Sequence, residues 1–114
     1  MAFNLSVRMI PEEVKTLAAA GIIAGYTAVG TPLIQPSRIM LINNLTDALV
    51  MFSFDGVTDH LALNPAQALV IDIAANKTQT DGFFLAEGEV LFVKRIDIPT
   101  TGAVYFTNFY GLNI

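Results

Sequence analysis

The chain contains no cysteine, no tryptophan and a single histidine among its 114 residues. Without cysteine it can form neither a disulfide nor a thiolate metal site, and its redox compartment cannot be inferred. A zinc site normally draws several nitrogen or sulfur ligands, and one imidazole cannot supply them. These absences exclude a disulfide scaffold and a zinc enzyme.

Charged residues are scarce as well. They make up 14% of the chain, and six basic against ten acidic residues give a net charge of −4. The basic residues are scattered, with only Lys94 and Arg95 adjacent. Because nucleic-acid binding needs a basic face that neutralises phosphates, neither nucleic acid nor an anionic membrane is expected as a partner.

Hydrophobic residues, by contrast, are in surplus at 54%. A chain of this length forms one domain, and its high surface-to-volume ratio leaves too little interior for that much apolar material. Large exposed apolar patches usually mark contact sites. The composition therefore predicts a homo-oligomer or an assembled particle with extensive subunit contacts.

One uncharged stretch has to be considered as a possible membrane-spanning helix. Residues 16–37 carry no charge, and Gly21 and Gly25 have the G-x-x-x-G spacing of some transmembrane helix dimers. Pro32 and Pro36 interrupt the run, so we expect strands joined at a glycine instead. The N-terminus also lacks the basic and apolar regions of a secretory signal, which predicts synthesis and assembly in the cytoplasm.

Short apolar runs separated by turn residues predict an all-β chain of about eight strands. Asp55-Gly56 and Asn64-Pro65 are turn pairs of this kind. The expected strands are residues 22–29, 37–43, 48–54, 60–63, 68–73, 83–86, 90–96 and 103–110, with residues 14–19 as a possible addition.

Two of these runs predict how their strands are buried. Residues 37–43 are almost continuously apolar, which is typical of a strand buried on both faces. In residues 68–73 the pattern alternates, so that Leu69, Ile71 and Ile73 share one face and Asp72 lies on the other.

The strand pattern indicates an antiparallel β-sandwich, with a jelly roll as the expected topology and an immunoglobulin-like order as the open alternative. We expect the sandwich domain to span residues 21–114. Residues 1–20 are expected to form an N-terminal arm, extended or with a short helix opened by Pro11, Glu12 and Glu13. Low charge and weak periodicity over residues 2–36 suggest that such an arm reaches a neighbouring subunit.

Asp55, Asp59 and His60 form the most suggestive polar cluster. A calcium loop of the EF-hand type needs oxygen ligands at alternating positions and a closing glutamate, which this stretch lacks. We interpret it as a hairpin turn in which Asp55 accepts backbone N–H groups and Asp59 begins the return strand. Weak calcium binding by Asp55 and Asp59 remains the alternative.

Residues that could form a catalytic site are equally few. Ser53 with His60 is the one conceivable pair of nucleophile and base, and Ser53 lacks the G-x-S-x-G turn that exposes a nucleophile. Glu87 and Glu89 offer a carboxylate pair on one strand face, but they are more simply solvated turn charges around Gly88. The sequence therefore predicts no catalytic, cofactor-binding or metal-ligating residue and a non-enzymatic protein.

The C-terminal aromatic residues have two interpretations. Strand alternation places Tyr105 with Phe109 on one face and Phe106 with Tyr110 on the other. One face is expected to be core. The other is expected either to be core as well or to contact a subunit, because aromatics are enriched in interfaces, with carbohydrate stacking as the alternative.

Several of these segments together resemble small structural proteins of tailed bacteriophages. The similarity covers roughly residues 20 to 111 and lies in the succession of turns and strands, without a catalytic signature. It is carried by N-N-x-T-D at residues 43–47, M-F-S-F-D-G-V-T-D-H at residues 51–60, E-G-E-V-L-F-V-K at residues 87–94, T-G-A-V-Y-F at residues 101–106, and Tyr110.

The resemblance implies a jelly-roll component of the virion, assembled in the host cytoplasm. Its expected partners are the major capsid protein or neighbouring virion proteins, and a second copy of itself, with a dimer favoured. Capsid cement, or decoration, on the outside of the shell is the favoured role. A head–tail neck or tail component and a carbohydrate- or receptor-binding module are the alternatives.

Overall fold

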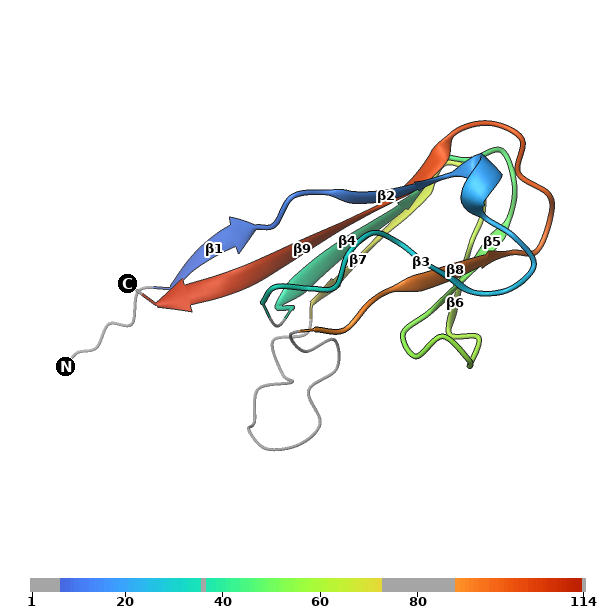
Figure 1. The fold of residues 1–114 in the computed structure, drawn as a ribbon. Helices are drawn as coiled ribbons and strands as arrows, with labels where there is room; N and C mark the ends of the chain where they lie inside the picture. Colours follow the sequence, from blue (N-terminus) through green and yellow to red (C-terminus); the bar gives the residue numbers. More distant parts are fainter. Residues whose placement is uncertain (1–6, 36, 73–87, 114) are drawn as a thin grey trace.

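A computed structural model describes residues 7–35, 37–72 and 88–113 of the chain. Within these ranges the fold is all-β, with nine strands, one short 3-10 turn η1 (Ala19–Gly21) and no α-helix. The strands form two antiparallel sheets packed face to face (Figure 1). The predicted antiparallel β-sandwich is confirmed.

Each sheet combines strands from both halves of the chain. In sheet A, β1 and β2 lie end to end along one edge of β9, and β4 and β7 follow on its other side. Sheet B has the order β3-β8-β5-β6. The bounds are β1 (Val7–Pro11), β2 (Lys15–Ala18), β3 (Thr27–Ala28), β4 (Ile39–Asn44), β5 (Val50–Ser53), β6 (Leu61–Leu63), β7 (Gln67–Asp72), β8 (Phe92–Arg95) and β9 (Ala103–Asn113).

The strand pairing identifies the topology. Counting from β2, each strand of the first half pairs antiparallel with its counterpart in the second half: β2 with β9, β3 with β8, β4 with β7 and β5 with β6. The pairs β4–β9 and β5–β8 then join these strand pairs into two sheets. This nested pairing is a jelly roll, which decides between the two topologies that the sequence left open.

The N-terminal segment is extended. Residues 15–18 form strand β2, followed by the single turn of η1, so the helical alternative for residues 11–20 does not occur. Both β1 and β2 pair with β9 of the same chain. The part of the expected arm that the structure describes therefore completes the chain's own sheet.

Some strands are shorter than the sequence predicts. Of residues 22–29 only Thr27 and Ala28 form a strand, and residues 23–25 are exposed between the buried Ile22 and β3. β8 likewise covers only four residues of 90–96. The strand expected at residues 83–86 lies outside the described residues.

The core lies between the two sheets. Phe52 and Val93 of sheet B face Phe106 and Ile42 of sheet A, and all four are fully buried. Leu69 and Ile71 of β7 pack against this core, which confirms the predicted alternation in that strand. Ile73 lies outside the described residues.

The prediction that residues 37–43 are buried on both faces is wrong for the single chain. In β4, Met40 and Ile42 are buried in the core, whereas Ile39 and Leu41 are half-buried on the opposite face. The reason is that a two-layer sandwich covers each sheet on one face only. β4 thus carries more apolar side chains than its own chain buries.

Candidate interaction surface

Four loops meet at one end of the sandwich, at the right of Figure 1. Because neighbouring strands are antiparallel, the connections that follow β2, β4, β6 and β8 all emerge at this end. We call this surface the loop end. It comprises residues 19–26, 45–49, 64–66 and 96–102.

Backbone hydrogen bonds tie these loops to one another. The Ala19 N–H donates to the Gly102 carbonyl at 2.9 Å, which joins the first loop to the last. The N–H groups of Ile96 and Asp97 both donate to the Leu49 carbonyl at 3.1 Å. The loop end is therefore a connected structure and not a set of independent loops.

A carboxylate reinforces the contact between two of the loops. Asp47 accepts the N–H groups of Thr100 at 2.8 Å and Thr101 at 3.2 Å, and its second oxygen accepts the Thr100 hydroxyl. The hydrogen bond from the Thr100 hydroxyl, followed by those from the two N–H groups, lowers the pKa of Asp47 from 3.8 to about 2. Asp47 stays charged because every one of these donors favours the carboxylate.

The buried amide of Asn44 connects a third loop to this end. Its Nδ2 donates to the carbonyls of Ala48, Leu63 and Asn64 at 2.9, 3.0 and 3.1 Å. Its Oδ1 accepts the Thr46 N–H at 3.0 Å and the Thr46 hydroxyl at 2.6 Å. One side chain thus satisfies backbone groups of two loops. Asn44 belongs to the N-N-x-T-D segment at residues 43–47, and nothing in that local sequence indicated this role.

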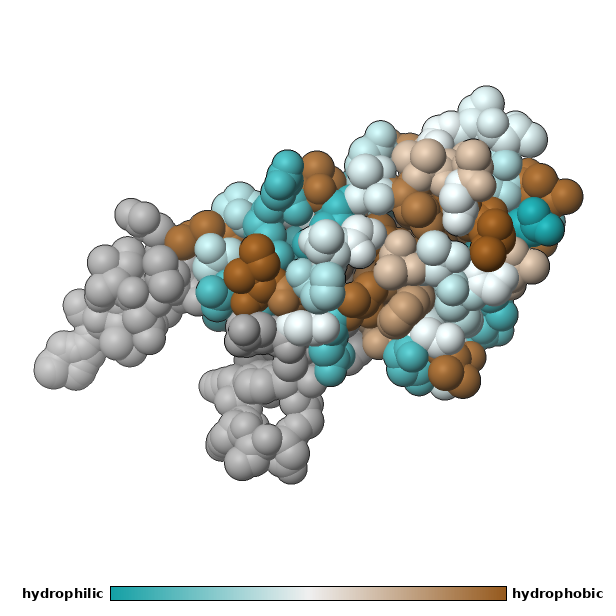
Figure 2. Space-filling view, viewed as in Figure 1, coloured by the Kyte–Doolittle hydropathy of each residue, from teal (hydrophilic) through white to brown (hydrophobic). Residues whose placement is uncertain are grey.

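Aliphatic side chains are exposed on this rigid support. Ile23, Leu45, Ile96 and Ile98 are 51%, 53%, 45% and 69% exposed, and they make up half of the exposed large hydrophobic residues among those described. Figure 2 shows strongly hydrophobic residues over the β8–β9 loop at this end. Exposed apolar groups held in fixed positions are suited to protein contacts, because little ordering entropy is lost on binding.

The β5–β6 hairpin contains the acidic cluster singled out in the sequence. The Asp55 carboxylate accepts the N–H groups of Val57 and Thr58 at 2.8 Å and the Ser53 hydroxyl at 2.8 Å. These bonds, led by those from Thr58 and Val57, hold the pKa of Asp55 well below its usual range. Gly56 has φ +80°, as a tight turn requires. The predicted turn role of Asp55 is confirmed.

Asp59 and His60 make separate contacts. The His60 Nδ1 accepts the Phe54 N–H at 3.0 Å. This nitrogen is therefore not placed to act as a base for Ser53. Asp59 accepts the Tyr26 hydroxyl at 2.6 Å and forms an ion pair with Lys94 at 2.9 Å. The hydrogen bond from Tyr26, followed by the one from Lys94, lowers the pKa of Asp59. The expectation that Asp59 begins the return strand is wrong, since β6 starts at Leu61 and Asp59 instead links the hairpin to β8.

Within the described ranges, no three histidine, aspartate or glutamate side chains come together as a metal site would need. Glu89 is exposed, and Glu87 lies outside the described residues. Residues 16–35 contain η1, β3 and all of β2 except its first residue. The part of the chain that the structure describes has no helix of the length and apolarity that crossing a bilayer demands.

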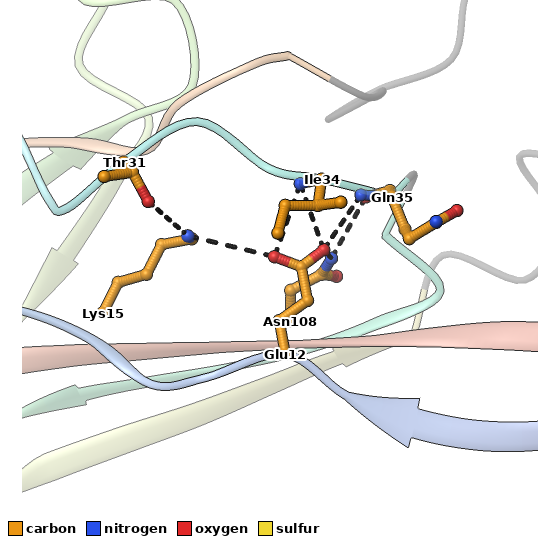
Figure 3. A network of polar contacts seen from close by, with 6 residues as sticks. All are labelled: Glu12, Lys15, Thr31, Ile34, Gln35 and Asn108. Carbon is orange, nitrogen blue, oxygen red and sulfur yellow. Dashed lines mark hydrogen bonds and ion pairs between the residues drawn. The ribbon is translucent and has the colours of Figure 1, made fainter.

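Glu12, which was expected at most to open a short helix, is a buried carboxylate between β1 and β2. Glu12 accepts the N–H groups of Ile34 at 3.2 Å and Gln35 at 2.9 Å, and the Asn108 Nδ2 at 2.9 Å (Figure 3). Its side chain is 4% exposed. Glu12 thereby fastens the segment before β4 onto β9.

Lys15 completes this network from β2. Its Nζ lies 3.8 Å from the Glu12 carboxylate and donates to the Thr31 hydroxyl at 3.1 Å. A shallow cavity of about 340 Å³ opens beside the pair, bordered by the exposed side chains of Val14 and Ile34. Because the Lys15 side chain is only 8% exposed and already paired, the arrangement serves to hold the chain segments together.

The aromatic residues of β9 alternate as predicted. Phe106 is buried in the core, while Tyr105 and Phe109 lie half-buried on the outer face of sheet A. Tyr110 shares the inner face with Phe106 and is also half-buried. The outer pair is the one available for a subunit or a carbohydrate.

Comparison with known proteins identifies no relative: no family model matches the chain, and no curated protein and no solved structure is significantly similar to it.

Proposed function

We propose that this chain is a non-enzymatic structural protein of a tailed-bacteriophage virion, a capsid cement protein whose loop end binds the assembled shell. The observation that carries the proposal is the loop end itself, where exposed aliphatic side chains sit on loops locked by hydrogen bonds. Jelly rolls recur among viral capsid proteins, and the succession of turns and strands resembles small phage structural proteins. Both support the same role.

The charge of the loop end indicates what kind of shell surface it fits. Its four loops contain no lysine or arginine, and their two charged residues are Asp47 and Asp97. Asp47 is engaged with the β8–β9 loop, whereas Asp97 is exposed beside Ile96 and Ile98. A complementary site on the major capsid protein is an apolar depression bordered by lysine or arginine.

The location in the particle is tested by counting copies. The protein is quantified by mass spectrometry in purified particles from cells that make it. Shell cement requires copy numbers in proportion to the major capsid protein, whereas a neck ring holds only about a dozen subunits, as its rotational symmetry allows. Absence from purified particles contradicts both roles.

The loop end is tested by rebinding. Shells stripped of the protein are mixed with the wild type, with Ile98→Asp or with Val57→Asp. Val57 is the matched control, because it is also highly exposed but lies in the β5–β6 hairpin. We expect Ile98→Asp to lose binding and Val57→Asp to keep it. Equal binding of all three proteins overturns the assignment of the loop end.

A carbohydrate- or receptor-binding module is the second candidate, favoured by Tyr105 and Phe109 on the outer face of sheet A. Jelly rolls also occur in lectins. This candidate requires glycan binding that disappears in Tyr105→Ala, with the loop-end variant Ile98→Asp unaffected.

A further inference from the structure

Sheet A has an outer face that the chain itself leaves uncovered in part. Strand alternation and the cross-strand register determine which side chains share this face. Within the residues whose side chains are described, the outer face consists of Ile39, Leu41 and Asn43 on β4, Ala68, Val70 and Asp72 on β7, Ala103, Tyr105, Thr107 and Phe109 on β9, Thr16 and Ala18 on β2, and Pro11 on β1.

This face is unusually apolar for a sheet surface in contact with water. Leu41 is flanked by Val70 on one neighbouring strand and Thr107 on the other, so the central row carries no charge. Val70 is 62% exposed. An antiparallel sheet with one solvated face normally places polar residues there. β4 instead has the sequence of a strand buried on both faces, and its own chain buries only one of them.

We propose that the outer face of sheet A binds the same face of a second copy of this chain, forming a symmetric dimer. A two-fold dimer brings identical patches together, so each apolar row meets another apolar row. The proposal does not depend on the role in a virion.

The charge of the face favours a second copy over a different partner. Asp72 is the one charged residue among the described members of the face, and the Arg38 Nε lies 3.9 Å from its carboxylate. The patch is therefore close to neutral. A strongly charged partner finds no counter-charges on it, whereas an identical neutral face is neither repelled nor left with unpaired charges.

The size of the face is of the order that a protein contact needs. The five strands of sheet A contain 32 residues, so at about 3.4 Å per residue and about 4.8 Å per strand the face covers roughly 500 Å² in projection, and side chains that stand out of the sheet add to its accessible surface. A specific interface buries about 800 Å² on each partner. Two such sheets can pack face to face at about 10 Å, as the layers of a sandwich do.

The dimer leaves the loop end free. Strand ends and sheet faces are different surfaces of a sandwich, so self-association through sheet A does not cover the β8–β9 loop. Each dimer then carries two loop ends. If the two-fold axis lies along the strands, both loop ends point the same way, and binding through both raises the avidity for a repetitive surface without any new contact.

The test is sedimentation equilibrium of the wild type, Val70→Asp and Val57→Asp. Both valines are highly exposed, but Val57 lies on the β5–β6 hairpin and provides the matched control. We expect a wild-type dimer, at least about tenfold weaker dimerisation in Val70→Asp because each copy brings one buried charge, and no change in Val57→Asp. Circular dichroism checks that Val70→Asp folds. If it does not, Val70→Lys takes its place, with the same expected weakening of the dimer.

Salt distinguishes this interface from one held by ion pairs. Because the face is nearly neutral, we expect the dimer dissociation constant to change little between low and high salt. A wild type that stays monomeric up to about 200 μM, well above micromolar affinity, overturns the proposal. So does dimerisation that Val70→Asp leaves intact, or a monomer that binds a glycan through Tyr105.

Discussion

The carboxylate of Asp47 accepts the backbone N–H of Thr100 at 2.8 Å, across a sequence separation of 53 residues. This bond connects the β4–β5 loop to the β8–β9 loop, which displays Ile96 and Ile98. The exposed aliphatic residues of the loop end thus depend for their placement on a carboxylate that is itself outside any strand. The relationship leads to a prediction about acid stability.

Replacing Asp47 with Asn is expected to lower the melting temperature at neutral pH. The folded pKa of Asp47 is about 2 against an ordinary 3.8, so its carboxylate stabilises the fold above pH 3.8 and loses that effect as the pH falls towards 2. The deficit of the variant should therefore shrink in acid. Thermal unfolding followed across this pH range checks it, with Asp97→Asn as the control for loss of one negative charge. A deficit independent of pH contradicts the role of the charge.

The turns were predictable because their chemistry is local. Asp55-Gly56 marks a chain reversal in the sequence, and the structure has φ +80° at Gly56. The spacing of the turns then indicated the number of strands and a sandwich. Nested antiparallel pairing is one of the few ways to connect that many short strands into two packed sheets. These features need only a few neighbouring residues, so the sequence displays them directly.

The buried polar network was not predictable in the same way. Pro11-Glu12-Glu13 is typical of an exposed break in the chain, yet Glu12 is buried because the N–H groups of Ile34 and Gln35 arrive from a distant segment. No local sequence pattern indicates a hydrogen-bond partner from so distant a segment. For the buried Asn44 a weak signal exists: an asparagine side chain often accepts the backbone N–H two residues later, as Asn44 does from Thr46, but this tendency does not indicate burial.

Asn44→Ala is expected to destabilise the fold by about 2–4 kcal/mol, because several buried backbone carbonyls lose their donor and no water replaces it. Asn43→Ala is the matched control. Its side chain lies half-buried on the outer face of sheet A, and the expected cost is below about 1 kcal/mol. Urea unfolding measures both, at a protein concentration held constant. A cost for Asn44→Ala no larger than that of the control contradicts the role of the amide as a hub.

Glu12→Ala is expected to cost about 3 kcal/mol, because it leaves the Lys15 ammonium buried without its carboxylate and removes the acceptor for two backbone N–H groups. Glu13→Ala, at the exposed neighbouring position, should change stability by less than about 0.5 kcal/mol.

The double variant Glu12→Gln with Lys15→Met separates charge pairing from hydrogen bonding. Replacing both members of a buried pair is often tolerated, and glutamine keeps an acceptor for the N–H groups of Ile34 and Gln35. We therefore expect the double variant to be more stable than Glu12→Ala. Equal losses would contradict the explanation that Glu12→Ala is costly because it leaves Lys15 unpaired and two N–H groups without an acceptor.

Gly102→Ala should be the most damaging substitution in the loop end. Gly102 has φ +84°, and a Cβ placed there would lie 2.0 Å from the Leu45 carbonyl oxygen, a backbone atom that cannot simply rotate away. Backbone conformation and steric overlap therefore act together. Gly88 has φ +88° with open space around it, and Gly25 has open space without a positive φ, so the three alanine variants form a series.

We expect Gly25→Ala to be nearly neutral and Gly88→Ala to cost about 1–2 kcal/mol from the left-handed conformation alone. Gly102→Ala should cost more than about 3 kcal/mol or prevent folding, since the β4–β5 and β8–β9 loops must separate to admit the methyl group. Chemical denaturation ranks the three. If Gly102→Ala costs no more than Gly88→Ala, the two loops are not in close backbone contact, and the rigidity of the loop end, on which its proposed binding to the shell depends, is lost as an argument.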